Sequence, residues 1–107
     1  MLHVLVVRYT APMDRVAPVV PGHVDYLDRW HSYGVFLASG QTEPEEIGGV
    51  ILAAGPRELV EKVAAEDPFV LADVAAYEII SVNVARAHPE LGALLESLGE
   101  PERAGDR

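Results

Sequence analysis

The sequence predicts a single α+β domain in which strands and helices follow one another in the order β-α-β-β-α-β. Three observations support this fold class: apolar runs of strand length, two longer segments with helical apolar spacing, and Gly or Pro residues between them. A chain of 107 residues suffices for one two-layer core and is too short for two domains. Right-handed crossovers place both helices on one face of a four-stranded antiparallel sheet.

The first half of the chain supplies a strand, a helix and a second strand. Leu2–Tyr9 is rich in β-branched side chains and predicts a buried strand. Pro18 and Pro21 exclude a regular helix through Arg15–Val20, so we expect the first helix to begin at Pro21 or Gly22. This helix ends at Gly34, and Val35–Gly40 forms the second strand.

The second half continues with a strand, a helix and a last strand. Gly48–Ala54 is the third strand, and Arg57–Glu66 has the apolar spacing of the second helix. Asp67 ends this helix, because Pro68 disfavours helical geometry in the residue before it. After a short turn, Ala75–Val84 forms the fourth strand.

The remaining residues extend beyond this order of elements. A stripe of leucines over residues 88–98 predicts a short appended helix that starts after His88. The polar segment 100–107 predicts a mobile tail. We therefore expect one domain over residues 1–99, followed by this tail.

Composition and charge exclude several function classes. Half of the residues are hydrophobic, which is typical of a globular chain, and the formal net charge is −9. This acidity argues against binding to nucleic acid and to anionic membranes. The absence of cysteine excludes disulfides, thiolate nucleophiles and cysteine-ligated metals. Without a basic leader or a membrane-length apolar run, we expect a soluble cytoplasmic protein.

The predicted topology brings the polar candidates to one edge of the sheet. His23 lies where the first helix begins and Asp67 where the second helix stops, and both positions fall on the edge where strands one and two end. The other candidates at this edge are expected to contact a substrate. They are Arg8, Tyr9, Ser39, Gly40, Gly48, Phe69 and Tyr77.

His23 and Asp67 are the candidate catalytic pair. A carboxylate that fixes the tautomer of an imidazole and raises its basicity makes a general base suited to neutral pH. The alternatives are that His23 is a core histidine with one hydrogen bond and that Asp67 is a turn residue bonded to local backbone amides. Both roles of Asp67 are compatible, because a carboxylate has two oxygens.

The other candidates also have structural alternatives. Arg8 either binds a substrate carboxylate or phenolate, or pairs with Asp67 or a glutamate of the connection between strands two and three. Tyr9, Ser39 and Tyr77 either contact a ligand or pack at the edge, and Gly48 allows a bulge or close backbone approach. No close spacing of His and Glu ligands occurs, and no phosphate loop or dinucleotide motif is present. We therefore expect no metal and no organic cofactor.

The sequence resembles the YCII-related (YciI-like) family over about residues 2–85, roughly four fifths of the chain. The resemblance rests on a histidine at the start of the first helix, on glycines at element ends and on an Asp-Pro-aromatic triplet. These residues are His23-Val24-Asp25-Tyr26-Leu27, Gly34, Gly40, Gly48-Gly49 and Glu66-Asp67-Pro68-Phe69.

The resemblance implies a ferredoxin-like protomer of the dimeric α+β barrel superfamily, with an active site around the histidine and the aspartate. One branch of the family resembles a dehydrochlorinase for chlorinated, hydroxylated aromatics, and relatives of this architecture isomerise lactones or oxygenate aromatics without a metal. Two features depart from the family. Val20 replaces an arginine that often lies one turn before the histidine, and the chain continues through Glu90–Leu98.

We therefore expect a small homodimeric enzyme, joined through its sheet faces, with His23 as general acid/base and Asp67 as its orienting partner. The expected chemistry is elimination, isomerisation or hydrolysis of a small, partly hydrophobic organic molecule. Two alternatives stay open: a non-catalytic ligand-binding or assembly module of the same fold, and a cofactor-free oxygenase.

Overall fold

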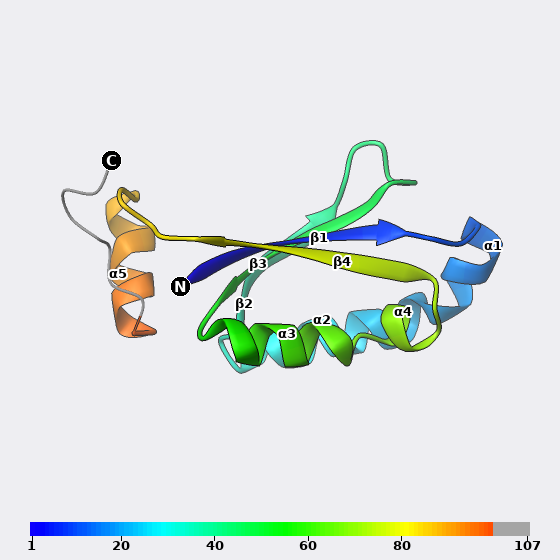
Figure 1. The fold of residues 1–107 in the computed structure, drawn as a ribbon, viewed down its shortest axis with the longest axis horizontal. Coiled ribbons are helices and arrows are strands. Elements are labelled where there is room, and N and C mark those ends of the chain that lie inside the picture. The colour runs from blue at the N-terminus through cyan, green and yellow to red at the C-terminus, as the bar shows by residue number, and fades with distance from the viewer. Residues whose placement is uncertain (100–107) are drawn as a thin grey trace.

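The structure, a computed structural model, describes residues 1–99 and contains a four-stranded antiparallel sheet with helices on one face (Figure 1). The strand order is β2-β3-β1-β4, so β1 lies inside the sheet and pairs with both β3 and β4. The strands are β1 (Leu2–Tyr9), β2 (Phe36–Gln41), β3 (Gly48–Ala54) and β4 (Ala75–Val82). The predicted α+β, ferredoxin-like fold is confirmed. The expected tail over residues 100–107 lies outside the described residues.

The helices follow the predicted order, with additional turns. They are α1 (Met13–Val16), the 3₁₀ helix η1 (Ala17–Val19), α2 (Val20–Ser32), α3 (Arg57–Ala65), α4 (Pro68–Leu71) and α5 (Pro89–Ser97). The absence of helix before Pro21 was a wrong prediction. Pro18 and Pro21 each lie in the first turn of η1 or α2, where an N–H has no intrahelical partner, so proline is tolerated.

Two boundaries differ in the second half of the chain. The turn expected after Asp67 is a short helix, α4, whose N-cap is Asp67 itself. Its carboxylate accepts a hydrogen bond from the backbone N–H of Phe69 at 2.9 Å. β4 ends at Val82 rather than at Val84.

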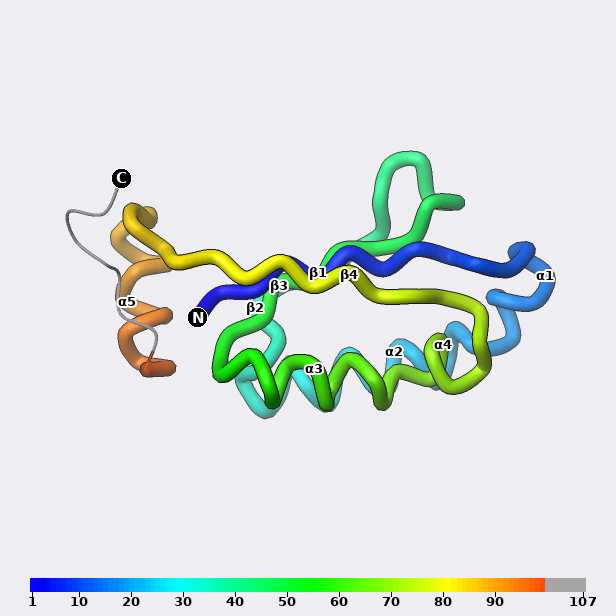
Figure 2. The backbone as a smooth tube through the Cα atoms, in the orientation of Figure 1, coloured from blue at the N-terminus to red at the C-terminus, as the bar shows by residue number. Residues whose placement is uncertain are grey.

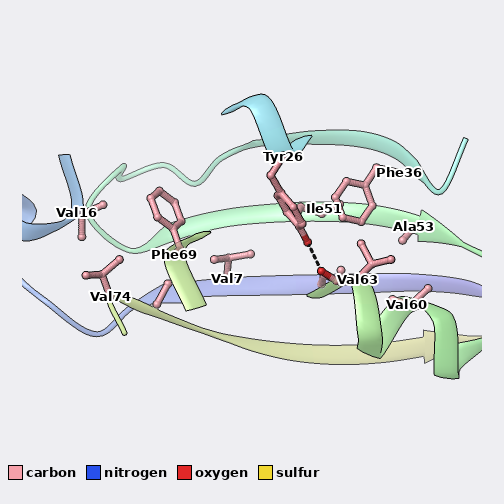
Figure 3. Packing of buried hydrophobic residues seen from close by; sticks show 12 residues of the cluster. Val7, Val16, Tyr26, Phe36, Ile51, Ala53, Val60, Val63, Phe69 and Val74 are labelled. Carbon is pink, nitrogen blue, oxygen red and sulfur yellow. Dashed lines mark hydrogen bonds between the residues drawn. The ribbon is translucent and has the colours of Figure 1, made fainter. Parts of the chain in front are cut away.

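The core lies between the sheet and α2, α3 and α4. Leu5, Val7 and Ile51 are buried on the helix-facing side of β1 and β3. Figure 3 shows side chains of this cluster, with the hydroxyl of Tyr26 donating to the carbonyl oxygen of Val63 at 2.8 Å. This bond ties α2 to α3, the two helices whose ends carry His23 and Asp67.

The opposite face of the sheet lies away from α2, α3 and α4 (Figures 1 and 2). Because side chains alternate along a strand, Val4, Val6 and Arg8 of β1 face this side while Leu5 and Val7 face the helices. Ile80 of the neighbouring strand β4 is 47% exposed. The uncovered apolar face that the topology predicted is therefore present.

α5 lies beyond the end of the sheet, apart from the helical layer (Figure 2). Leu95 is buried, whereas Leu91, Leu94 and Leu98 of the same stripe are exposed. No helix within residues 1–99 combines the length and apolarity needed to cross a membrane.

Candidate active site

The structure brings His23 and Asp67 into direct contact. His23 lies in the first turn of α2, and Asp67 precedes α4 on the other crossover, 44 residues away. Nδ1 of His23 lies 2.8 Å from Oδ1 of Asp67. A carboxylate accepts hydrogen bonds, so Nδ1 carries the proton and donates it, which leaves Nε2 as the unprotonated nitrogen of a neutral ring.

Asp67 is fully buried and is held by three donors from three elements. Its Oδ1 accepts from His23 and from the backbone N–H of Phe69 at 2.9 Å. Its Oδ2 accepts a short hydrogen bond from the hydroxyl of Tyr77 on β4. The two roles considered for Asp67, a turn residue and a partner of His23, are thus held by one side chain at once.

The ring of His23 is fixed by stacking as well as by its hydrogen bond. It lies over the ring of Phe69, with centroids 3.9 Å apart and planes 12° from parallel. The side chain of His23 is 15% exposed, and the described residues offer its Nε2 no hydrogen-bond partner. His23 also lines a cavity.

The cavity lies between α2 and strands β1, β2 and β3 and has a volume of about 220 Å³. Of the residues expected at a substrate, Tyr9, Ser39, Gly40, Gly48 and Phe69 line it. The rest of the wall is apolar apart from one amide, that of Gln41. These further lining residues are Val7, Val20, Val24, Leu27, Gln41, Gly49, Val50 and Ile51. Because no lining side chain besides His23 can carry a charge near neutral pH, the cavity suits an uncharged molecule.

Arg8 and Tyr77 do not line this cavity. Arg8 is exposed on the opposite face of the sheet, because it is offset by one residue from Val7 and Tyr9. It forms none of the expected pairs with Asp67 or with a glutamate of the β2–β3 connection. Tyr77 faces the helices, but its hydroxyl is used by Asp67 rather than presented to the cavity.

Gly48 is required by a close approach of two backbones. It has φ of +150°, and a Cβ atom at this position would lie 1.8 Å from the carbonyl oxygen of Val7. The approach expected from its place in the sequence is therefore present, and it shapes the β3 wall of the cavity.

Two features of the site were not predicted from the sequence. Tyr77 was expected at the substrate, and nothing in the sequence marks it as a donor to Asp67. The second feature is a contact of His31 in the last turn of α2, whose Nε2 lies 2.9 Å from the hydroxyl oxygen of Ser39 at the cavity wall.

Burial changes the acidity of the two tyrosines near the pair. The pKa of Tyr77 is raised far above its usual range, first by burial and then by the negative charges that Tyr26 and Asp67 carry when ionised. Burial also raises the pKa of Tyr26. Both hydroxyls therefore stay protonated over the ordinary pH range and act as donors. Within residues 1–99, no group of three His, Asp or Glu side chains is arranged to hold a metal ion.

Comparison with known proteins identifies a family and solved structures with a similar fold. Residues 1–83 match the YCII-related domain. No curated protein sequence matches the chain. The fold is similar to that of 5-chloro-2-hydroxyhydroquinone dehydrochlorinase (TftG) from Burkholderia phenoliruptrix AC1100, solved with 2,5-dihydroxybenzoquinone, at a TM-score of 0.61 and 18% identity. The match covers 78% of this chain and 95% of that protein, and α5 lies beyond the domain match.

Proposed function

The chain belongs to the YCII-related domain family, and from this premise we propose that it is a small enzyme in which His23 and Asp67 perform acid/base chemistry. His23 is the general acid/base and Asp67 orients it. The reaction class is elimination, isomerisation or hydrolysis, and the site uses no cofactor. We further propose that the enzyme works in the cytoplasm, as expected from the sequence.

The observation that supports this proposal most strongly is that only one of the two ring nitrogens of His23 is hydrogen-bonded within the described residues. Nδ1 is engaged by Asp67 at 2.8 Å, while the ring borders a cavity in which Nε2 has no partner among the described residues. The developing imidazolium is then stabilised by the buried carboxylate.

The cavity supports a small, uncharged and partly hydrophobic substrate. Its wall is mostly apolar, and its polar groups are Tyr9, Ser39, Gln41, His23 and backbone amides and carbonyls. TftG, whose fold is similar, is a dehydrochlorinase for a chlorinated hydroxyhydroquinone. A hydroxylated aromatic ring with a leaving group is therefore the first substrate class to test. Nε2 would take a proton from the substrate, and the released electron pair would expel the leaving group or be reprotonated at another atom.

The proposed enzyme is a homodimer joined through the open face of the sheet. Val4, Val6 and Ile80 lie on this face, and Ile80 is 47% exposed. Uncovered apolar side chains of this kind mark interfaces. The proposed domain includes α5, which lies beyond the end of the same sheet (Figure 1) and contains exposed leucines.

The test is turnover of a panel of halogenated hydroxyhydroquinones and small lactones by the unmodified protein and by His23→Ala. We expect turnover with the unmodified protein and a loss of about 10²–10⁴-fold in the variant. His88→Ala is the matched control, because His88 is an exposed histidine at the start of α5 and is expected to leave turnover unchanged. Equal turnover by His23→Ala and the unmodified protein would refute the assignment.

A second candidate is a non-catalytic module that binds the same class of molecule. The absence of a cationic side chain from the cavity wall favours it, because no guanidinium or ammonium group is there to stabilise a developing anion. Saturable binding of hydroxylated aromatics without any turnover across the panel would support this candidate. The third candidate, a cofactor-free oxygenase, predicts oxygen uptake with phenolic substrates.

A further inference from the structure

We propose that Tyr77 is a positioning residue for His23, acting through Asp67: its hydroxyl occupies Oδ2 of the carboxylate and thereby assigns Oδ1 to the imidazole. The inference rests on the proposed role of the His23–Asp67 pair. It adds a third member, from a strand that contributes no residue to the wall of the cavity.

The hydrogen bonds of Asp67 show how the carboxylate is fixed. Oδ1 accepts from the N–H of Phe69 at 2.9 Å and from Nδ1 of His23 at 2.8 Å, and Oδ2 accepts from the hydroxyl of Tyr77. A carboxylate can rotate about its Cβ–Cγ bond, so one anchor would leave its direction free. Anchors on both oxygens, one from α4 and one from β4, fix the plane of the group and leave one direction for the imidazole.

Tyr77 is suited to this role because it remains a hydrogen-bond donor. Burial, followed by the negative charge of Asp67 close by, raises its pKa well above the usual range, so the phenol does not ionise near neutral pH. Asp67 is fully buried, so no exposure to bulk water replaces the bond if the hydroxyl is lost. A buried acceptor left without a donor costs about 1–3 kcal/mol.

The hydrogen bond from Tyr77 also reduces the negative charge density on the Asp67 carboxylate that faces His23. A donor to Oδ2 withdraws electron density from the carboxylate, so the attraction between Asp67 and a protonated His23 is weaker than with an unshared carboxylate. Removal of the hydroxyl therefore stabilises the imidazolium and moves the midpoint of the His23 titration to higher pH. Removal of the carboxylate's charge does the opposite.

The other titratable groups around the pair are few. The ring of Tyr26, also on α2, stacks against that of His23 with centroids 6.0 Å apart. Glu66 is the C-cap of α3 and precedes Asp67, and the ring of Tyr9 on β1 contacts that of Phe69 edge to face. Tyr26 stays neutral because burial raises its pKa, and Glu66 is exposed. Within residues 1–99, Tyr77 is the only side chain besides His23 that donates a hydrogen bond to Asp67.

The test is a pH titration of the His23 ring by NMR, in protein labelled with ¹⁵N-histidine and without any substrate. We expect Tyr77→Phe to raise the titration midpoint by about 0.5–1 pH unit and Asp67→Asn to lower it. Tyr33→Phe is the control. It also removes one phenolic hydroxyl, from a side chain that is 67% exposed, so it should leave the midpoint unchanged.

Opposite shifts in Tyr77→Phe and Asp67→Asn distinguish tuning from general loosening, which would move both variants in the same direction. If Tyr77→Phe does not fold, 3-fluorotyrosine incorporated at position 77 supplies a stronger donor and should lower the midpoint. An unchanged midpoint in a folded Tyr77→Phe protein, or in the fluorotyrosine protein, overturns the inference. Because no turnover is measured, this result is independent of the His23→Ala assay that tests the proposed function.

Discussion

The two ends of the sheet each contain a histidine in a hydrogen-bond network, and the two networks differ in what they leave open. At one end, His3 of β1 is fully buried, with Nδ1 2.9 Å from the hydroxyl of Ser81 and Nε2 2.8 Å from the carbonyl oxygen of Gly55. At the other end, His23 uses Nδ1 for Asp67 and borders a cavity.

The comparison distinguishes His3, whose two ring nitrogens are both used in structural hydrogen bonds, from His23, which has one nitrogen available for chemistry. Gly55 offers only an acceptor, so Nε2 of His3 carries its proton and Nδ1 accepts from Ser81. Arg57 donates to the same hydroxyl oxygen at 2.9 Å, which completes the network and leaves no ring nitrogen of His3 free. His23 has the opposite tautomer, and its Nε2 has no hydrogen-bond partner within residues 1–99.

The largest expected difference between the two ends is in turnover. His23→Ala should reduce it by about 10²–10⁴-fold, because the proposed acid/base is removed. His3→Ala should leave the turnover of the folded fraction unchanged. Steady-state rates with the panel of aromatic and lactone substrates, corrected for the folded fraction by circular dichroism, check both. A comparable loss in both variants would remove the functional distinction between the two histidines.

Stability should show the reverse order. His3→Ala empties a buried site and leaves the carbonyl of Gly55 and the hydroxyl of Ser81 without their partner, which should cost roughly 2–3 kcal/mol of unfolding free energy. His23→Ala affects a partly exposed ring at a helix start and should cost less. Urea denaturation of both variants measures this. A greater loss in His23→Ala would contradict the structural role given to His3.

Alkaline pH should lower the folding stability through Tyr26 and Tyr77, which lie near His23. Their pKa values are raised in the folded state above the ordinary value of 10, mainly by burial. The folded state then binds more protons than the unfolded state above pH 10, so stability is fully present below that pH and is lost as pH rises through and beyond it. Tyr26→Phe and Tyr77→Phe should each flatten this loss, measured as thermal midpoints from about pH 8 to 11. An equally steep loss in both variants would contradict it.

The smallest expected effect concerns the cavity wall. Ser39→Ala removes a hydroxyl that lines the cavity and lies 2.9 Å from Nε2 of His31, and it should weaken binding of a hydroxylated aromatic by about 2–5-fold. Ser97→Ala is the matched control, since its hydroxyl donates to a carbonyl within α5. Isothermal titration calorimetry measures both. Unchanged binding in Ser39→Ala would show that this hydroxyl does not contribute to ligand binding.

The sequence predicted the parts of the fold that depend on chain order and strand or helix patterns. The strands, α2 and α3 were expected within one or two residues of their bounds, and the crossover rule placed His23 and Asp67 at one edge. α1, η1 and α4 were missed, because the prolines near their starts were interpreted as helix breakers. Pro12 is the N-cap of α1, and Pro18 and Pro68 lie in the first turns of η1 and α4. There the missing N–H costs nothing.

Side-chain direction was the harder part of the site to predict. Arg8 was grouped with Tyr9 because the two are adjacent, although alternation along β1 puts them on opposite faces. Tyr77 was placed correctly at the edge, but its bond to Asp67 depends on the depth at which β4 packs against α4. No local pattern encodes that depth.

The most direct test of the central claim is the tautomer of the two histidines in one ¹⁵N–¹H correlation spectrum, recorded above the pH at which the rings are protonated. The structure predicts Nδ1–H for His23 and Nε2–H for His3. It further predicts that adding a hydroxylated aromatic shifts the Nε2 signal of His23 alone. An Nε2–H tautomer for His23, or a signal that does not respond to any such ligand, would contradict the proposed acid/base role.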